Sequence, residues 1–382
     1  MQSLSSLNIS GYALIDGVRK EQEAKGLDTT NLLVGDPDHA PPEVIKRFAR
    51  EAIDVDFTGY TDQQGDPELR DILADLVTKE GIKGADAGNI FVSSGSKPIA
   101  FGIVSRYVGP GQSLVLSLPY YASYIVQGQE ARGNALFSTS IDQTLGYMAQ
   151  DSVKAVLLVT PNNPDGIMLP NEDVMRVIEA ARGDQIVIMD EAYKDFYYSR
   201  QFHSIGGEID FSAQPNVAIV RTFSKALGIC GWRIGYSISG KELAQKLKKF
   251  QAGVLNPPNS IGQYAIREGV QSVGNDYYKG NRLKYKGRLE RLVSELSSNH
   301  VQAAMPEGAL YLWVPPHPGL FGEGTRFETA THFAHQLATE KRIFVWPGKD
   351  YGADDYVRIS MARVADEKIP DIARSFAEVL HG

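Results

Sequence analysis

Short apolar runs alternate with amphipathic windows along most of the chain. Between residues 46 and 285, seven runs rich in β-branched and aliphatic residues predict strands, at 90–92, 113–118, 135–138, 155–159, 185–189, 217–220 and 233–238. Windows with helical spacing lie between them, at 66–80, 98–107, 121–131, 171–182, 241–251 and 259–271. Because strands that alternate with helices are joined by crossovers, this order predicts a largely parallel sheet. Runs such as 155–159 are apolar throughout, which is typical of strands covered on both faces.

The two ends of the chain have a different pattern. Residues 1–45 contain a short helical pattern around Tyr12 and then a short apolar run that ends at Gly35. Residues 281–298 predict a long charged helix, and further strands and helices alternate beyond it. We therefore predict an α/β fold. A large three-layer domain with a mostly parallel seven-stranded sheet would span 46–285, and a smaller α+β domain with an N-terminal arm would combine 1–45 and 286–382.

Composition narrows the class of protein. Hydrophobic residues make up 43% and charged residues 22% of the chain, as in an ordinary soluble globular protein. The net charge of −7 argues against a nucleic acid partner. No apolar run approaches the roughly 18 residues that a membrane span needs, and the start does not resemble a signal peptide. Because Cys230 is the single cysteine, no intrachain disulfide forms, and we expect a cytoplasmic protein.

Polar motifs follow several of the predicted strands. In the Ser-Ser-Gly-Ser-Lys-Pro run at 93–98, Gly95 lets the backbone approach a ligand, and Ser96 and Lys97 begin a helix whose N–H groups attract anions. Further along, Tyr121 is placed to stack on a flat heterocycle and Asn163 to present an amide donor from a turn. Each motif has a plain structural alternative, respectively a helix cap, packing and a bare turn.

Asp190 and Tyr193 follow the strand predicted at 185–189. Ligands bind at the carboxyl edge of open α/β sheets, so the Asp190 carboxylate would lie where it can pair with a protonated pyridine nitrogen. Tyr193, three residues later, can reach a phenolic oxygen on the same ring. A helix cap is an equally good interpretation of Asp190 alone.

Residues 221–236 contain the candidate centre of the site. Lysine forms imines with aldehydes when burial or neighbouring cations favour its neutral amine, and Lys225 is the candidate. Thr222 adds a hydroxyl, and the donor fork of Arg233 matches phosphate oxygens. A surface turn ahead of a strand would look similar. Taken together, however, the motifs supply an imine lysine, a phosphate cradle, a ring stack and a pyridinium partner, which are the requirements of pyridoxal phosphate.

On these motifs the sequence resembles the fold type I pyridoxal phosphate enzymes, specifically the class I and II aminotransferases related to aspartate aminotransferase. The resemblance covers nearly the whole chain. Its most specific parts are the runs at 222–225, 231–236 and 161–164, Asp190 with Tyr193, and Arg358 in a Val-Arg-Ile-Ser run. The resemblance implies that Lys225, Asp190 and Tyr193 are catalytic. Lys225 would form the internal aldimine and then move a proton, and Asp190 would keep the ring nitrogen protonated.

The resemblance also assigns the binding positions. The cofactor positions are Gly95, Ser96, Lys97, Thr222 and Arg233 for the phosphate, Tyr121 for the ring face, and Asn163 and Tyr193 for the phenolic oxygen. Arg358 would bind the α-carboxylate of the substrate, in a pocket that Gly35 and Asn163 also line. Tyr60 matches a tyrosine that reaches the cofactor phosphate of the neighbouring subunit, which implies a homodimer with shared active sites.

The implied activity is the exchange of an amino group between an α-amino acid and a 2-oxo acid by a ping-pong mechanism. The alternative is a lyase or another amino-acid-modifying enzyme on the same scaffold, because elimination starts from the same carbanion. Condensing synthases usually have histidine at the Tyr121 position, and a transcription regulator of this type would need a DNA-binding extension. The amino acid itself is not predicted. Its side-chain pocket is expected to use residues near 12–18 and 254–260 and residues of the partner subunit.

Three features depart from the family pattern or lie outside it. Asp165 stands where the family usually has threonine, and we expect it to face solvent. Cys230 falls at a variable position and is expected to pack against its neighbours. His332 and His335 share one predicted helix face and are expected at the surface, so we predict no metal site.

Overall fold

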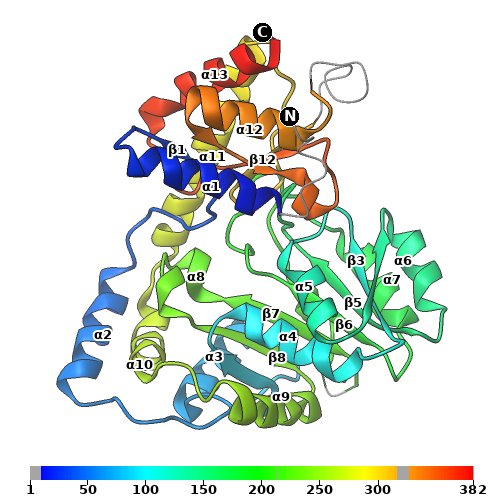
Figure 1. Cartoon of the computed structure of the whole chain (residues 1–382). Coiled ribbons are helices and arrows are strands. Elements are labelled where there is room, and N and C mark those ends of the chain that lie inside the picture. The colour runs from blue at the N-terminus through cyan, green and yellow to red at the C-terminus, as the bar shows by residue number, and fades with distance from the viewer. Residues whose placement is uncertain (1–9, 212, 316–326, 382) are drawn as a thin grey trace.

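The computed structural model describes residues 10–211, 213–315 and 327–381. It contains a large body built around a seven-stranded sheet and a smaller body that holds both ends of the described chain (Figure 1). The long helix α11 (Asn275–Ser298) runs from one body to the other. The predicted domain boundary between 285 and 286 falls inside this helix, so the division into domains stays a prediction.

The large sheet has the strand order β2-β8-β7-β6-β5-β3-β4. Its strands are β2 (Ile90–Ser93), β3 (Ser113–Ser117), β4 (Asn134–Ser138), β5 (Val153–Val159), β6 (Ile186–Asp190), β7 (Val217–Thr222) and β8 (Gly235–Ser239). The strands from β4 to β7 pair in parallel, whereas β8 is antiparallel to both of its neighbours. The prediction of a mostly parallel seven-stranded sheet is confirmed.

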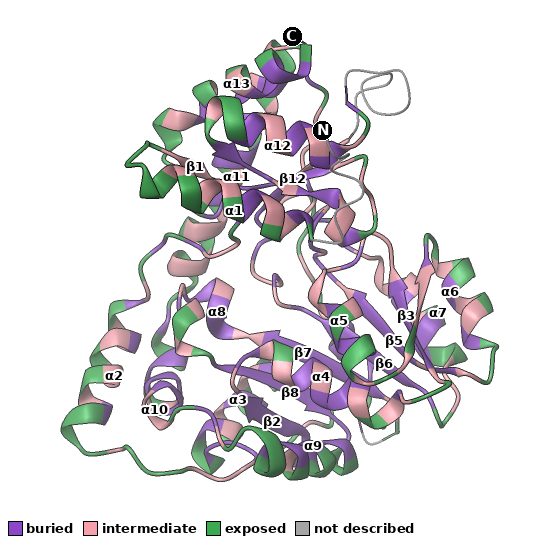
Figure 2. Ribbon diagram, viewed as in Figure 1, coloured by how far each residue is buried: buried purple, intermediate pink, exposed green. Residues whose placement is uncertain are grey.

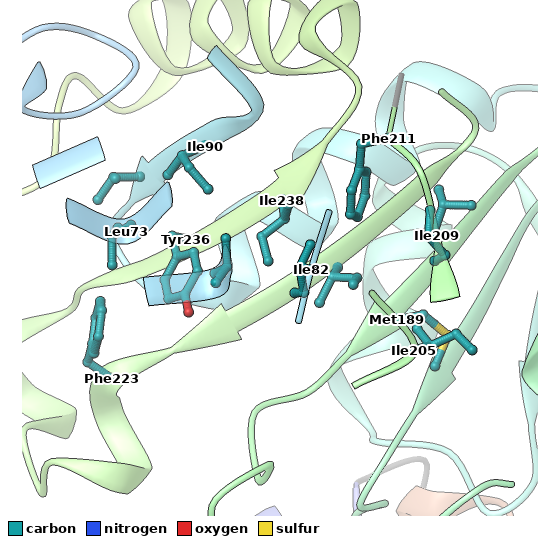
Figure 3. Packing of buried hydrophobic residues seen from close by; sticks show 14 of the residues in the cluster. Leu73, Ile82, Ile90, Met189, Ile205, Ile209, Phe211, Phe223, Tyr236 and Ile238 are labelled. Carbon is teal, nitrogen blue, oxygen red and sulfur yellow. The ribbon is translucent and has the colours of Figure 1, made fainter. Parts of the chain in front are cut away.

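Helices cover both faces of this sheet, because successive strand residues point to opposite faces. On β6, Ile186 and Ile188 pack in one core cluster, and Val187 and Met189 pack in the other. The first cluster is completed by α4 (Ser96–Tyr107), α5 (Ser123–Glu130) and α9 (Lys241–Val254). The second is completed by α2 (Glu43–Asp54), α3 (Pro67–Lys79), α6 (Ile141–Met148), α7 (Asn171–Ala180) and α10 (Ser260–Gly269). Burial therefore extends through three layers (Figure 2), and Figure 3 shows part of the second cluster.

The smaller body has its own core, to which both ends of the described chain contribute. An antiparallel sheet of order β11-β12-β9 combines β11 (Trp346–Pro347), β12 (Val357–Ser360) and β9 (Tyr311–Val314), and β1 (Thr30–Asn31) pairs in parallel with β10 (Ile343–Phe344). The helices are α1 (Gly11–Ala24), α12 (Ala330–Lys341) and α13 (Ile369–His381). None of the helices in the described ranges is long and apolar enough to cross a membrane.

One predicted strand begins later than expected. We predicted a strand at 233–238, but β8 starts at Gly235 and Arg233 has a φ of 57° at the end of the short 3-10 turn η4 (Cys230–Trp232). A left-handed φ is incompatible with a strand. The chain must reverse between β7 and the antiparallel β8, and this reversal displaces Arg233 from the sheet.

Candidate active site

A cavity of about 560 Å³ lies at the carboxyl ends of β5, β6 and β7, beneath the smaller body. Eleven of the residues predicted for the site line it: Gly35, Ser96, Lys97, Tyr121, Asn163, Asp190, Tyr193, Thr222, Lys225, Arg233 and Arg358. Two predicted residues do not. Gly95 lies just behind the wall, against Arg233. Tyr60 is 87% exposed and lies outside the cavity of its own chain.

Lys225 is placed by a short helix that directly follows β7. Thr222, the last residue of the strand, caps this helix, α8 (Phe223–Ala226), by accepting from the Ser224 N–H at 3.2 Å. The Lys225 Nζ donates to the Gly35 carbonyl at 2.7 Å and lies 3.6 Å from the Cys230 Sγ. Strand end, cap and lysine thus follow within four residues, so the local sequence aims this amine into the cavity.

The surroundings of Lys225 favour its charged form. Burial lowers the pKa of the amine, but Tyr311, Cys230 and Tyr121 together outweigh this effect, and the pKa lies above its ordinary value. We had expected burial or neighbouring cations to favour the neutral amine. In the cavity, electron-rich oxygen and sulfur atoms surround the amine closely, and they stabilise the ammonium ion.

Asp190 ends β6 on the floor of the cavity and is buried. Its carboxylate accepts from the Tyr124 hydroxyl and, at 2.9 Å, from the Ala192 N–H. Burial raises the pKa of Asp190 to about 6, although these two hydrogen bonds oppose the shift. No helix begins directly after Asp190, so the helix-cap interpretation is wrong: one carboxylate oxygen binds the following turn, and the side chain lines the cavity.

The residues predicted to bind a phosphate converge at one end of the cavity. Arg233 donates from Nη1 to the Cys230 carbonyl at 3.0 Å and from Nη2 to the Ser94 carbonyl at 3.2 Å. Gly95, with a φ of +91°, caps α4, and a Cβ at this position would lie 2.4 Å from the Arg233 Nη2. A helix N-terminus, a guanidinium group and the Thr222 hydroxyl therefore face one space. This cluster fits a phosphate group.

Aromatic hydroxyls line the middle of the cavity. The Lys97 Nζ lies 5.2 Å from the centre of the Tyr121 ring. Although burial raises it, the pKa of Tyr121 is lowered overall by Lys97 and other neighbours. The Tyr193 hydroxyl shares a hydrogen bond of 2.6 Å with the Tyr311 hydroxyl, and burial raises the Tyr193 pKa well above its ordinary value.

Arg358 lies on β12, opposite the floor, and only 1% of it is exposed. Its Nη1 donates to the Asn163 Oδ1 at 2.9 Å and its Nη2 to the Leu33 carbonyl. The guanidinium carbon lies 4.2 Å from the centre of the Tyr311 ring and 4.5 Å from that of Trp346. Its Nε is buried without a hydrogen-bond partner. A rigid, stacked guanidinium of this kind can bind a carboxylate in a fixed orientation.

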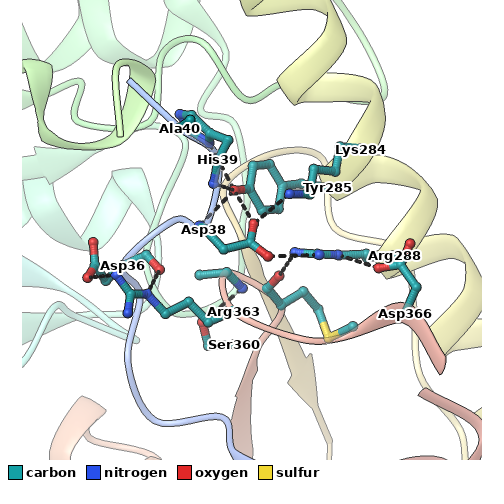
Figure 4. Close-up of polar contacts among 12 residues, drawn as sticks. Asp36, Asp38, His39, Ala40, Lys284, Tyr285, Arg288, Ser360, Arg363 and Asp366 are labelled. Carbon is teal, nitrogen blue, oxygen red and sulfur yellow. Dashed lines mark hydrogen bonds and ion pairs between the residues drawn. The ribbon is translucent and has the colours of Figure 1, made fainter. Parts of the chain in front are cut away.

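The Gly35 loop reaches the cavity because ion pairs anchor it from outside (Figure 4). Asp38 pairs with Arg288 and Lys284, each at 2.8 Å. Burial alone would raise the pKa of Asp38, but these two cations lower it to about 2. Gly35 itself cannot be replaced without movement, since a Cβ there would lie 1.9 Å from the Tyr311 Oη.

Several lining residues, Tyr311 and Trp346 among them, were not predicted, whereas Tyr12 falls in the range 12–18 that was expected for the side-chain pocket. Tyr311 and Trp346 contact Arg358, and the Tyr12 ring lies 4.5 Å from Trp346. Asp350 holds these segments together by accepting from Tyr12 N at 2.7 Å and from Trp346 Nε1 at 2.8 Å. The only signal in the sequence was that strands rich in aromatic residues lie near its C-terminal end. Such residues are equally typical of core packing, so they did not indicate a binding site.

Two expectations are wrong. Cys230 does not simply pack: it lines the cavity, and burial raises its thiol pKa to about 11. Asp165 does not simply face solvent: it is partly buried, lines a second cavity of about 190 Å³, and accepts from Asn162 Nδ2 at 2.9 Å. The tight turn keeps the Asp165 side chain close to neighbouring residues of the same turn, and burial raises the pKa of its carboxyl group. Across the described ranges, no three His, Cys, Asp or Glu side chains gather as a metal site.

Comparisons with known proteins agree with this geometry. The family model for aminotransferase class I and II matches residues 28–376. The aspartate aminotransferase of Thermotoga maritima is 28% identical over 94% of this chain and 93% of its own, and the aspartate/prephenate aminotransferase of Thermus thermophilus is 26% identical over 99% and 97%. The solved structure of the Thermus thermophilus aspartate aminotransferase with maleate has a TM-score of 0.88 at 25% identity, over all of both chains. The family resemblance is confirmed: this chain belongs to the class I and II aminotransferases.

Proposed function

We propose that the protein exchanges amino groups between an α-amino acid and a 2-oxo acid in a ping-pong mechanism, through an aldimine between Lys225 and pyridoxal 5'-phosphate. One observation carries the proposal. The Lys225 amine, the Asp190 carboxylate and the Arg358 guanidinium, from three distant segments, line a single cavity of about 560 Å³. The reaction requires these three groups: an amine that forms the imine, a carboxylate that pairs with the ring nitrogen of the cofactor, and a guanidinium that binds the carboxylate of the substrate.

The residues present fit the cofactor. Its phosphate would lie at the N-terminus of α4 with Arg233 and Thr222, Tyr121 would stack on its ring, and Asp190 would face the ring nitrogen. Asn163 and Tyr193 would donate to the phenolic oxygen. When bound, the cofactor supplies an aldehyde and an electron-accepting ring, which the side chains of the protein do not provide.

The residues of the chain would each perform one task. Arg358 would hold the α-carboxylate, and its stacking on Tyr311 and Trp346 fixes the orientation of the substrate. Lys225, held near Gly35 once its amine is free, would take the proton from the substrate Cα and deliver it to the former aldehyde carbon of the cofactor. Asp190 would remain an anion opposite the ring nitrogen, oriented by Tyr124.

The oligomeric state belongs to the proposal. Tyr60 is 87% exposed, and Gly65, five residues later, is fixed by close contact with Val92. We infer that a second copy of the chain receives Tyr60 at its phosphate site, which gives a homodimer with shared sites. Sedimentation of the purified protein as a monomer at all concentrations would contradict this. The cytoplasmic location stays a prediction.

Half-reaction spectroscopy tests the activity. The holoenzyme is mixed with one amino acid at a time. Aspartate is tested first because similar proteins are named aspartate or aspartate/prephenate aminotransferases. The expected result is conversion of the bound cofactor to its pyridoxamine form, and a 2-oxo acid should restore the original spectrum. An unchanged cofactor spectrum together with release of ammonia would favour the lyase alternative and overturn the proposal.

A further inference from the structure

A second large cavity, of about 690 Å³, lies behind the floor of the active site. Thr222 lines both cavities. Asp190 lines the first, whereas Glu191 and Arg221, each next in sequence to a site residue, line the second. This arrangement follows from the alternation of side chains at the ends of the parallel strands β6 and β7. The rear face thus holds charged residues directly behind the catalytic ones.

Arg221 is the centre of a buried network. Its side chain is 1% exposed and that of Glu191 is 0% exposed. The Arg221 Nε donates to the Glu191 Oε2 at 2.8 Å, and Nη1 donates to the Glu80 Oε2 at 2.7 Å. Glu191 also accepts a hydrogen bond from the Ser204 hydroxyl at 2.7 Å. The Tyr236 hydroxyl accepts from Arg221 Nη1 at 3.3 Å, and Tyr236 lies beside Phe223 in Figure 3.

The network joins the two strand ends that hold Asp190 and Lys225. Glu191 N donates to the Val220 carbonyl at 2.9 Å, and Val220 is paired with Asp190 in the sheet register. Arg221 immediately precedes Thr222, which caps the helix of Lys225. A shift of either partner of the pair therefore moves one of the two residues that would contact the cofactor.

The network also acts by charge. Glu191 is a buried anion next to Asp190, and like charges at close range disfavour the ionised form of each other. Arg221 supplies the compensating positive charge on the rear face. Burial is the largest cause of the raised pKa of Asp190, and Glu191 adds to it.

We propose that Arg221 and Glu191 are positioning residues, a buried ion pair that fixes the turn after β6 and balances the charge behind Asp190, so that Asp190 meets the cofactor ring as an anion. The inference rests on the proposed function, since it presumes that Asp190 pairs with the ring nitrogen. A pair that served only stability would affect unfolding alone.

The test is a pH titration of pyridoxal 5'-phosphate binding, followed by cofactor absorbance and fluorescence quenching. Glu191→Gln removes the negative charge while keeping the shape, so cofactor should be retained to lower pH, by on the order of one pH unit. Arg221→Met leaves Glu191 uncompensated, so retention should be lost at higher pH by a similar amount. Opposite shifts from the two members of one ion pair are the signature of the proposed role.

The other groups that face Asp190, Tyr124 of α5 and Lys225 of α8, stay unchanged in both variants. In an Asp190→Asn background, Glu191→Gln should no longer shift the midpoint. If Arg221→Met does not fold, Arg221→Lys replaces it and should give a smaller shift of the same sign. Equal or same-sign shifts in the two variants, or a shift that persists without Asp190, would overturn the inference. Failure of the wild-type chain to bind cofactor would instead refute the proposed function.

Discussion

The two walls of the active-site cavity are built differently. The floor (Asp190, Thr222 and Lys225) comes from the ends of the neighbouring strands β6 and β7, and backbone hydrogen bonds and a helix cap hold it. The roof (Gly35, Tyr311 and Arg358) comes from three segments, of which the first and the last are more than three hundred residues apart in the sequence. Aromatic side chains hold it in place. The difference suggests a division of labour, with reaction chemistry on the floor and substrate recognition in the roof.

Substitution of the floor lysine should have the largest effect. Lys225→Ala removes both the imine-forming amine and the proton carrier, so the rate constant should fall by about 10⁴-fold or more and the imine absorption should disappear. Stopped-flow and steady-state absorbance measure both quantities. Lys97→Ala is the matched control, because it removes an amine from the same cavity and should leave the imine absorption in place. Turnover near that of the wild type in Lys225→Ala would refute the floor assignment.

Substitution of the roof arginine should affect recognition instead. Arg358→Lys loses the two-pronged contact and the stacking on Tyr311, so kcat/KM for the amino acid should fall on the order of 100-fold, mainly through KM. The imine absorption should remain. Arg363→Lys, at an exposed arginine paired with Asp36, serves as the control and should behave as the wild type. A fall confined to kcat would contradict a role in recognition.

Asp190→Asn should change cofactor binding and stability in opposite directions. Loss of a charge-assisted hydrogen bond should weaken cofactor binding on the order of 50-fold. The folded-state pKa of about 6 lies above the ordinary value of 3.8, so the ligand-free chain loses stability as pH rises from 4 to 6. At pH 8 the variant should therefore be more stable than the wild type by on the order of 3 kcal/mol and unfold at a higher temperature, and at pH 4 it should show little gain. Thermal unfolding of the cofactor-free proteins at both pH values checks this sign.

The smallest expected effect concerns the phosphate end of the floor. A Cβ in Gly95→Ala would lie 2.4 Å from Arg233, and the φ of +91° disfavours alanine. Displacement of the guanidinium should weaken cofactor affinity by about tenfold, as expected for partial loss of a charged contact. Equilibrium dialysis measures it. Gly146→Ala, where a Cβ meets nothing within 4 Å, should leave affinity unchanged, and equal affinities in both variants would argue against the cradle.

Local order along the chain was sufficient to predict most of the floor. Asp190 and Thr222 lie at the ends of strands that their apolar runs identify, and Lys225 follows three residues after Thr222. Parallel strands bring their carboxyl ends to one edge. Arg233 shows the limit of this reasoning. Its neighbours have strand composition, but the reversal into β8 forces it into a left-handed turn, and that constraint arises from pairing with β7 rather than from the run itself.

The sequence by itself determined the seven strands, their order along the chain and the family motifs that end them, because these depend on hydrophobic period and on residues close to one another. The tertiary structure alone decided that Tyr311 and Trp346 stack on Arg358, that Cys230 lies beside Lys225, and that Arg221 lies behind Asp190. The stacking on Arg358 joins segments far apart in the chain, whereas Cys230 and Lys225 are five residues apart and meet because of the turn before β8. The geometry of these contacts is set by how the chain packs in three dimensions, and no local pattern of residues specifies it.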